Sequence, residues 1–408
     1  RPAVTGGGAI ILSPGGAMKI LLVHNTYQHP GGEDTVFARE AALLREHGHG
    51  VVTYTRSNAE VRDFSPAARA LLPLRMIWAR DAVRDLRALI AAEKPDVAHF
   101  HNTHFMISPA AYTACREVGV PVVQTLHNPR LLCPAATFTR NERACQDCLG
   151  KTPPWPGILH GCYRSSRLQT AAVAAMLTVH RWRKTWATHV ACYVVFTEFY
   201  RQQFIAGGLP ADKLVVKPHF VAPDPLPREH EPGDYALYVG RLEPVKGVRV
   251  LLAAWEQIGA IPLKIRGEGP LAGEVGARAA LLEAVEIVER LSPEALIQIV
   301  KGARFLVWPS LGYYETFGLV AIEAFACGVP VIASRTGVMA EIVTDGVTGL
   351  HVTPGDPADL AAKVRWAWDH PAEMVEMGRA ARREYEQKYT AERNYAQLLR
   401  IYESVRGG

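Results

Sequence analysis

Short aliphatic and β-branched runs alternate with segments of helical periodicity through most of the chain, and this alternation restricts the fold more than any other feature. A short apolar run, a helix and a second apolar run in succession are typical of a parallel β-α-β unit. The first series has strands expected over residues 19–24, 51–55, 97–101 and 120–127, with a helix through Phe37 and Leu44. The pattern predicts a doubly wound α/β sheet with helices on both faces.

A proline-rich stretch interrupts the alternation near the middle of the chain. Pro218, Pro223, Pro225 and Pro227 disfavour regular structure there, because proline fixes its own φ and lacks a backbone donor. A second alternating series follows, with strands expected over residues 236–240, 263–266, 286–288, 305–308 and 331–333. Since 408 residues suffice for two domains, the sequence predicts two doubly wound α/β domains.

We place the first domain at residues 18–218, the linker at 219–232 and the second domain at 233–390. Residues 1–17 are rich in glycine and proline and lack the apolar core of a secretory signal, so we expect a disordered leader before Met18. Residues 391–408 are expected to hold a C-terminal helix that packs on the first domain. Four of its larger residues fall on one face: Tyr395, Leu398, Leu399 and Tyr402.

Composition argues against several classes of protein. The longest apolar run, residues 171–179, is about half of the length that a transmembrane helix needs. Seven cysteines are an odd number in a chain without an export signal, which favours reduced thiols and a cytoplasmic protein. No nucleic-acid-binding motif accompanies the net charge of +5, and we expect no nucleic acid as a partner.

Residues directly after the strands are the candidate site, because ligands of open α/β sheets bind beyond the carboxyl ends of the strands. One such segment, residues 240–247, reads Gly-Arg-Leu-Glu-Pro-Val-Lys-Gly. Arg241 offers a fork of donors to phosphate oxygens, Lys246 a mobile charge, and glycines let the backbone approach a ligand. The motif indicates an anion site, with a solvated surface turn as the alternative.

A second motif follows the strand at 305–308. We expect a helix to begin near Phe317, where free amides favour a phosphate, and Glu315 and Glu323 to lie on similar azimuths facing one ligand. Carboxylates accept hydrogen bonds from sugar hydroxyls. The alternative for Glu315 is helix capping, worth about 0.3–1 kcal/mol, but this leaves Glu323 unexplained, since burying a glutamate in an apolar helix without a partner is costly.

The first domain offers two more candidate segments. Gly31-Gly32-Glu33 follows the first strand and His127-Asn128 follows the fourth, so both would lie at the same edge of the sheet. A histidine at a strand end is often only a hydrogen-bonded structural residue. His127 is therefore a candidate that needs support from its surroundings.

Four cysteines lie close together in sequence: Cys133, Cys145, Cys148 and Cys162. A Cys-x-x-Cys pair flanked by two further thiols suits tetrahedral zinc. The segment is rich in proline, arginine and threonine and has little to build a core, so a structural zinc would explain its order. Unrelated free cysteines are the alternative.

The region from Lys151 to Lys217 is strongly basic, with nine lysines and arginines against two acidic residues. Together with Trp182, Trp186 and the apolar residues before them, it could lie on an anionic membrane surface, such as the inner face of the plasma membrane, or hold an acidic acceptor. A solvated helix is the alternative.

These motifs resemble those of the retaining glycosyltransferases of family 4, which have the GT-B fold. The shared motifs, in the family's order, are residues 240–247, Gly267-Glu268-Gly269-Pro270, Pro309-Ser310, the glutamates at 315 and 323, residues 328–333, Glu341-Ile342-Val343 and residues 346–349. The resemblance covers nearly the whole chain after Met18. It implies two Rossmann-like domains facing a central cleft, with the C-terminal helix crossing back to the first domain.

The resemblance also implies roles for individual residues. Arg241 and Lys246 would hold the donor diphosphate, Glu323 the ribose hydroxyls and Glu315 the hydroxyls of the transferred sugar. The amides of Phe317, Gly318 and Leu319 would lie near the reacting carbon. Gly31 and Gly32 would approach the phosphates, and His127 would lie beside the anomeric centre. Glu289 stands in the loop that contacts the base, where relatives usually have glycine, and leaves a UDP-, GDP- or ADP-sugar open.

The expected reaction is transfer of a sugar from a nucleoside-diphosphate sugar to a saccharide or lipid-linked acceptor in cell-surface polysaccharide or glycolipid synthesis. Two cations and a helix N-terminus can stabilise the departing diphosphate, so we expect no cofactor for the chemistry. The alternatives are a sugar-nucleotide epimerase or hydrolase on the same fold, and a non-catalytic protein that binds a nucleotide-sugar.

Overall fold

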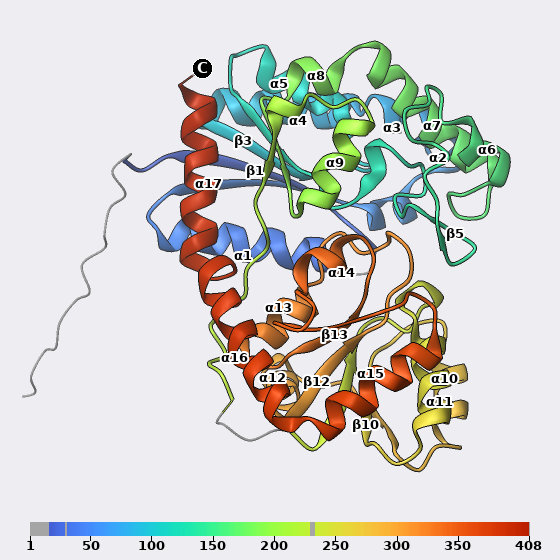
Figure 1. The fold of residues 1–408 in the computed structure, drawn as a ribbon. Helices are drawn as coiled ribbons and strands as arrows, with labels where there is room; N and C mark the ends of the chain where they lie inside the picture. Colours follow the sequence, from blue (N-terminus) through green and yellow to red (C-terminus); the bar gives the residue numbers. More distant parts are fainter. Residues whose placement is uncertain (1–15, 29–30, 229–232, 408) are drawn as a thin grey trace, which may run out of the picture.

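The computed structural model describes residues 16–28, 31–228 and 233–407, which form two α/β units, each built on a six-stranded parallel sheet (Figure 1). All neighbouring strands within each sheet run parallel, as the alternating sequence pattern predicts. The expected leader up to residue 15 and the expected linker residues 229–232 lie outside the described residues.

The first sheet has the strand order β2-β1-β3-β4-β7-β8. Its strands are β1 (Lys19–Thr26), β2 (Gly50–Ser57), β3 (Val97–Asn102), β4 (Val122–Thr125), β7 (Cys192–Val195) and β8 (Leu214–Val216). Its helices are α1 (Gly32–Glu46), α2 (Pro66–Ala70), α3 (Leu72–Ile77), α4 (Arg80–Glu93), α5 (Tyr112–Arg116), α6 (Trp155–His160), α7 (Arg167–Trp182), α8 (Thr185–His189) and α9 (Glu198–Ala206). A short antiparallel hairpin, β5 (Thr139–Arg140) and β6 (Arg143–Ala144), projects from this unit.

The second sheet has the strand order β11-β10-β9-β12-β13-β14, the arrangement of a doubly wound nucleotide-binding domain. Its strands are β9 (Tyr235–Val239), β10 (Leu263–Arg266), β11 (Val285–Val288), β12 (Ala303–Trp308), β13 (Val331–Ser334) and β14 (Gly349–Val352). Its helices are α10 (Val248–Ile258), α11 (Ala272–Ala279), α12 (Pro293–Gly302), α13 (Leu319–Ala326), α14 (Gly337–Ile342), α15 (Pro357–Asp369) and α16 (Pro371–Lys388).

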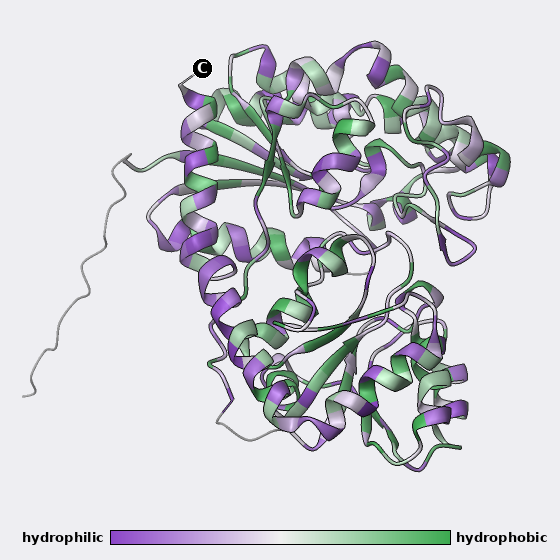
Figure 2. Cartoon of the chain, in the orientation of Figure 1, coloured by the Kyte–Doolittle hydropathy of each residue, from purple (hydrophilic) through white to green (hydrophobic). Residues whose placement is uncertain are grey.

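Apolar burial holds each sheet between its helices. Strand β1 keeps Ile20, Leu21, Leu22 and Val23 at 1% exposure or less, as expected for a strand covered on both faces. Figure 2 shows the strands of both sheets in hydrophobic colours and more polar residues along the outer helices. In the described part of the chain, no helix combines the length and the hydropathy needed to cross a bilayer.

The C-terminal helix α17 (Ala391–Arg406) returns to the first unit (Figure 1). Tyr395, Leu398 and Tyr402 pack into the same buried cluster as Ile20 and Leu22 of β1. The Tyr402 hydroxyl lies 2.7 Å from Nδ1 of His99 on β3, and Tyr395 forms a hydrogen bond with His49. The predicted crossing of this helix to the first domain is therefore confirmed.

Candidate active site

The loops after β9 and β12 meet at the point where the strand order of the second sheet reverses, which is where doubly wound sheets bind ligands. Gly247 ends the first loop with φ of +73°, and a Cβ there would lie 1.9 Å from the carbonyl oxygen of Pro309 in the second loop. Only glycine permits this approach. Gly247 thus allows the loop that carries Lys246 to pack against the loop that leads to Glu315.

Lys246 and Glu315 form an ion pair where the loops after β9 and β12 meet. The Lys246 ammonium donates to Glu315 Oε1 at 2.7 Å, and the two side chains are 18% and 11% exposed. Trp308 Nε1 and the Ser310 hydroxyl donate to the same oxygen at 3.0 and 2.7 Å. Burial opposes ionisation, but the Lys246 charge and these hydrogen bonds lower the pKa of Glu315 below its ordinary value. With three donors on Oε1, the second carboxylate oxygen remains available to a ligand hydroxyl.

The helix after Glu315 begins later than the sequence suggested. Helix α13 starts at Leu319 with Gly318 as its N-cap, so Glu315 and Phe317 lie in the preceding loop, and the prediction that Glu315 and Glu323 share a helical face was wrong. The cause is Gly318, whose φ is +110° and where a Cβ would lie 2.1 Å from the Trp308 ring. This left-handed residue separates the loop from the helix.

The Phe317 side chain is buried at the contact between the two units. It lies edge-on to His219, with ring centroids 5.1 Å apart, and 6.1 Å from Phe196 of the first unit. Because Phe196 follows β7 and Phe317 follows β12, the carboxyl ends of both sheets point toward this junction. Phe317, Gly318 and Leu319, predicted to present their amides, therefore lie where the two units meet.

Glu323 lies on α13, one of the most apolar helices of the protein. Burial raises the pKa of its carboxyl, and the nearby Arg39 of α1 opposes that shift. Glu323 is partly exposed, and no described residue forms a hydrogen bond with its carboxyl, so this group is left available for a ligand.

Two other predicted donor residues lie at the periphery. The Arg241 side chain is 68% exposed and pairs with Glu243 at 2.7 Å. Glu289 is exposed and directly follows β11, the edge strand of the second sheet. Neither contacts Lys246 or Glu315, and a ligand that reached all of them would extend along the carboxyl edge of the sheet.

The start of α1 faces the start of α13. Gly31 caps α1 and Gly32 is its first residue, and a Cβ on Gly32 would lie 3.9 Å from Leu319 Cδ1. Two helix N-termini, each carrying free amides and the positive end of a dipole, thus lie next to each other. The arrangement favours an anion between the two units.

His127 follows β4 and begins a row of buried histidines. Its Nε2 lies 3.0 Å from Nδ1 of His101, and its ring is stacked 6.1 Å from that of His219, which contacts Phe317. Burial, reinforced by the neighbouring histidines, lowers the pKa of His127 well below its usual value. The ring is therefore neutral at pH 7.

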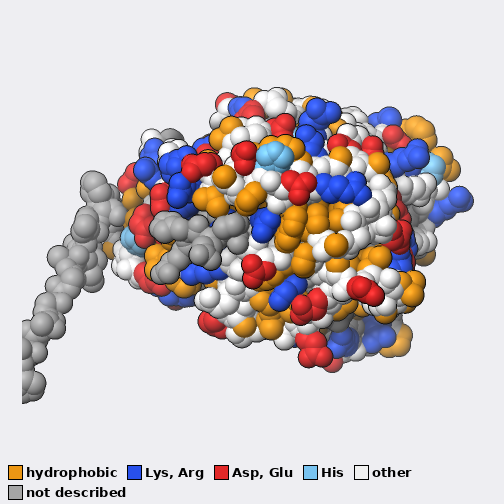
Figure 3. All heavy atoms as spheres, turned by 60° about the horizontal axis from the view of Figure 1, so that its bottom comes forward, with side chains coloured by type: hydrophobic (Ala, Val, Ile, Leu, Met, Phe, Trp, Pro, Cys, Tyr) orange, Lys and Arg blue, Asp and Glu red, His pale blue; other side chains and the backbone are white. Residues whose placement is uncertain are grey.

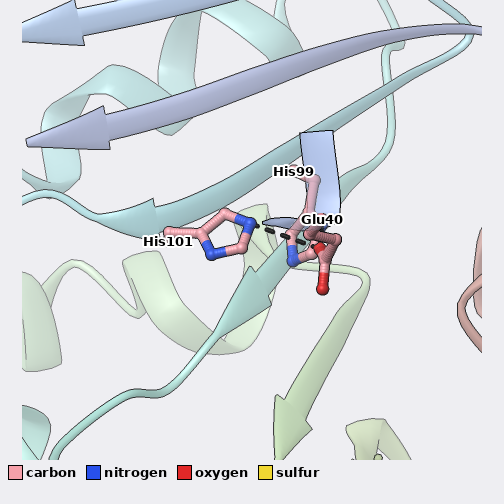
Figure 4. Close-up of side chains that lie close together, drawn as sticks. All are labelled: Glu40, His99 and His101. Atoms are coloured by element: carbon pink, nitrogen blue, oxygen red, sulfur yellow. Dashed lines mark ion pairs between the residues drawn. The ribbon is translucent and has the colours of Figure 1, made fainter. Parts of the chain in front are cut away.

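The row continues from His101 to Glu40, which lies within 4.8 Å of His99 and His101 (Figure 4). Glu40 Oε1 is 3.1 Å from His99 and 3.4 Å from His101, while Oε2 is 3.0 Å from the ammonium of buried Lys217. Although burial opposes ionisation, Lys217 and the two histidines hold the pKa of Glu40 well below its usual range. The Lys217 ammonium thus neutralises the Glu40 carboxylate. The cluster also contacts His101, whose ring forms the hydrogen bond with His127.

The sequence motifs assign no role to Glu33, which directly follows Gly31-Gly32. The Glu33 carboxylate accepts a hydrogen bond from Asn128, the neighbour of His127, at 2.7 Å, and burial raises its pKa to about 7. Such a group exchanges a proton near neutral pH. Its position after Gly31-Gly32 was visible in the sequence, but its contact with Asn128 depends on the fold.

The structure also brings the four predicted metal ligands together. Cys133, Cys145, Cys148 and Cys162 line one small cavity beside the β5–β6 hairpin, and all four are free thiols. The other cysteines, Cys115, Cys192 and Cys327, are buried elsewhere.

Comparison with known families matches both units. A Glycosyl transferase 4-like domain model matches residues 31–219, and a Glycosyl transferases group 1 model matches residues 227–384. The chain belongs to glycosyltransferase family 4. The family and the α/β architecture predicted from the motifs are therefore confirmed.

The alignments with curated relatives cover less than half of the chain. D-rhamnosyltransferase WbpZ of Pseudomonas aeruginosa is 35% identical over 160 residues, which are 38% of this chain and 42% of that protein. A glycogen synthase of Mycobacterium tuberculosis is 39% identical over 153 residues, or 36% of each chain. The matches thus span less than half the length of these relatives.

Solved structures share the complete fold. HepE of Anabaena, in complex with UDP, has a TM-score of 0.67 at 18% identity and covers 95% of this chain and 100% of that chain. Sucrose-phosphate synthase of Thermosynechococcus elongatus has a TM-score of 0.70 at 20% identity, covering 95% and 98%. This likeness establishes the GT-B fold of the family 4 chain.

Proposed function

We propose that this family 4 protein is a retaining glycosyltransferase that moves a sugar from a nucleoside-diphosphate sugar to a saccharide or lipid-linked acceptor. The observation that carries the proposal is the Lys246–Glu315 pair, set beside the start of α13, with Gly32 of the first unit next to Leu319. These groups offer positive charge, amides and a carboxylate oxygen within one junction. HepE, a structure with the same fold, binds UDP and UDP-glucose.

In the proposed reaction the bond between the anomeric carbon and the diphosphate oxygen breaks while the acceptor oxygen bonds to that carbon from the same face. The leaving phosphate oxygen takes the acceptor proton. Lys246, Arg241 and the helix amides stabilise the departing diphosphate, so no metal is assigned to the chemistry. Glu315 orients sugar hydroxyls, Glu323 the ribose, and neutral His127 lies beside the anomeric carbon.

The first test is a panel of UDP-, GDP- and ADP-sugars, measured by thermal shift and by release of nucleoside diphosphate with and without crude lipid or oligosaccharide acceptors. We expect one donor to stabilise the protein selectively, with release dependent on acceptor. Release without acceptor would indicate a hydrolase, a rearranged donor an epimerase, and binding without turnover a non-catalytic protein. Failure of every donor to bind would contradict the proposal.

We also propose a peripheral contact between the first unit and an anionic membrane, in keeping with a role in surface polysaccharide or glycolipid synthesis. Large apolar side chains on helices α6 and α7 are exposed: Trp155 (55%), Leu159 (51%), Leu168 (82%) and Trp182 (74%). Trp186 and the Ala/Val/Met stretch that precedes Trp182 pack mainly into the core, so they cannot contribute as the sequence suggested. The face of the molecule that is turned forward in Figure 3 differs from the exposed apolar surface of α6 and α7, because it carries a mixture of basic, acidic and apolar side chains.

Vesicle flotation tests this contact. We expect the protein to bind vesicles that contain phosphatidylglycerol, and Trp182→Ala to bind them more weakly. Binding should be lost in 0.5 M salt, where the Debye length falls to about 4–5 Å. Equal recovery with neutral and anionic vesicles would contradict it.

A further inference from the structure

The four cysteines that line the cavity beside the β5–β6 hairpin come from three separate parts of one segment. Cys133 precedes the hairpin, Cys145 and Cys148 follow its second strand, and Cys162 lies after α6. The cavity has a volume of about 20 Å³, which is the space of a single water molecule or ion. The four cysteines therefore surround room for one ion.

We propose that these thiols bind a structural zinc ion. Four cysteines in a tetrahedral arrangement are a ligand set that zinc prefers, and Cys145-x-x-Cys148 after a hairpin has the spacing of a zinc knuckle. In the structure no three of the four sulfurs lie within 4.8 Å of one another, whereas the ligand atoms of Glu40, His99 and His101 do. Binding thus requires the sulfurs to close around the ion to a Zn–S distance of about 2.3 Å.

The surroundings of the thiols fit a thiolate site. The Gly157 amide donates a hydrogen bond to Cys148 Sγ at 3.2 Å, and a Cβ on Gly157 would come within 3.3 Å of that sulfur. Arg140 also lines the cavity and pairs with Asp147 at 2.9 Å. Amide donors and a nearby cation offset the negative charge that four thiolates bring to a metal.

All four cysteines in the cavity are free thiols. No disulfide forms among them, and the segment has few buried apolar residues besides Phe138 to order it.

The ion would hold the hairpin against the second unit. Gly312, in the loop that leads to Glu315, approaches Ala144 of β6 so closely that a Cβ would lie 3.0 Å from the Ala144 amide nitrogen. Glu142, in the hairpin turn, pairs with Arg249 of α10 at 3.1 Å. The proposed zinc thus fixes a segment that supports the loop of Glu315.

The experiment is elemental analysis of the unaltered protein, grown with zinc and purified without chelator. We expect about one zinc per chain, release of that zinc when a mercurial reagent titrates the thiols, and the visible spectrum of tetrahedral thiolate coordination when Co²⁺ replaces it. Cys145→Ser/Cys148→Ser should lose the metal and expose the segment to protease, while Cys192→Ser, a buried thiol outside the cavity, should keep it.

Three results would overturn the proposal: four free thiols that take up neither Zn²⁺ nor Co²⁺, disulfides among these cysteines, or iron with the absorption of an iron–sulfur cluster. The measurements on the unaltered protein decide the matter even if the double variant does not fold. Metal content does not depend on a sugar donor, so failure here leaves the proposed transferase function standing.

Discussion

At the scale of residues, the site is organised around carboxylates with different surroundings. Glu315 accepts three hydrogen bonds on one oxygen and is held ionised by Lys246, whereas Glu323 is half-buried on an apolar helix, with Arg39 as a compensating charge. A half-buried carboxyl without a hydrogen-bond partner is partly desolvated without compensation in the folded protein. Its presence is best explained by a ligand that supplies donors, such as the ribose of the proposed donor.

Replacing Glu323 with alanine should therefore lower donor turnover without unfolding the protein. Lost charged contacts in such a site cost about 2–4 kcal/mol, which is on the order of 30- to 1,000-fold in kcat/KM. The unfolding free energy should stay within about 1 kcal/mol or rise, because the variant removes a half-buried charged group that has no hydrogen-bond partner. Turnover within about threefold of the parent, with Glu403→Ala as an exposed control, would contradict the role of Glu323.

The sequence anticipated these charged residues better than their geometry. Arg241, Lys246, Glu315 and Glu323 were identified from motifs after strands, and the fold places them at the carboxyl edge of the second sheet. The mutual pairing of Lys246 and Glu315 was not foreseen, because it depends on the backbone approach of Gly247 to Pro309. Their assigned contacts with a donor remain predictions.

At the scale of elements, most strands of both sheets were predicted from the sequence, but three were not. The expected strand at residues 263–266 agrees with β10, while β7, β8 and β14 were not anticipated. Strands β8 and β14 are the edge strands at one end of their sheets, and β7 lies next to β8. Helix α17 was predictable because its apolar face repeats over four turns.

Leu398 tests the packing of α17 on the first unit. Its side chain is fully buried in the cluster that includes Ile20 and Leu22 of β1. Leu398→Ala should lower the unfolding free energy by about 2–5 kcal/mol through lost burial and the cavity left behind. Denaturant titration measures this change, and Arg400→Ala, exposed on the same helix, should shift it by less than about 0.5 kcal/mol. Equal effects of the two variants would show that α17 does not dock as described.

At the scale of the whole molecule, a buried polar network connects helix α1 with the C-terminal helix α17. Lys217, at the exit from the first sheet, bonds to Glu40 of α1 and Asn394 of α17, and His99 bonds to Tyr402. The histidine row connects this network to His127 and, through His219, to Phe317 of the second unit. The alternating pattern in the sequence predicts the two sheets, but it contains no signal for a network whose members are hundreds of residues apart.

Two buried histidines, His101 in this network and His180 of α7 outside it, predict a loss of stability on mild acidification. Burial lowers the pKa of both His101 and His180 to about 4, so the folded state resists a proton that the unfolded state binds below about pH 6.5. Stability should be complete above that pH and fall as the pH drops, by on the order of 2 kcal/mol for each histidine between pH 6.5 and 5. Urea titrations at these two pH values check the effect, and a midpoint that is unchanged or higher at pH 5 would contradict it.

The central claim, a nucleoside-diphosphate site built on the loops after β9 and β12, is tested most directly by calorimetric titration of UDP, GDP and ADP into the protein and into Lys246→Met. We predict that one nucleotide binds at one site per chain, that Lys246→Met weakens it about tenfold or more, a change of about 1.4 kcal/mol, and that Lys388→Met, on the surface of α16, does not. Absence of binding by all three nucleotides, or equal affinity of the parent and Lys246→Met, would contradict the account.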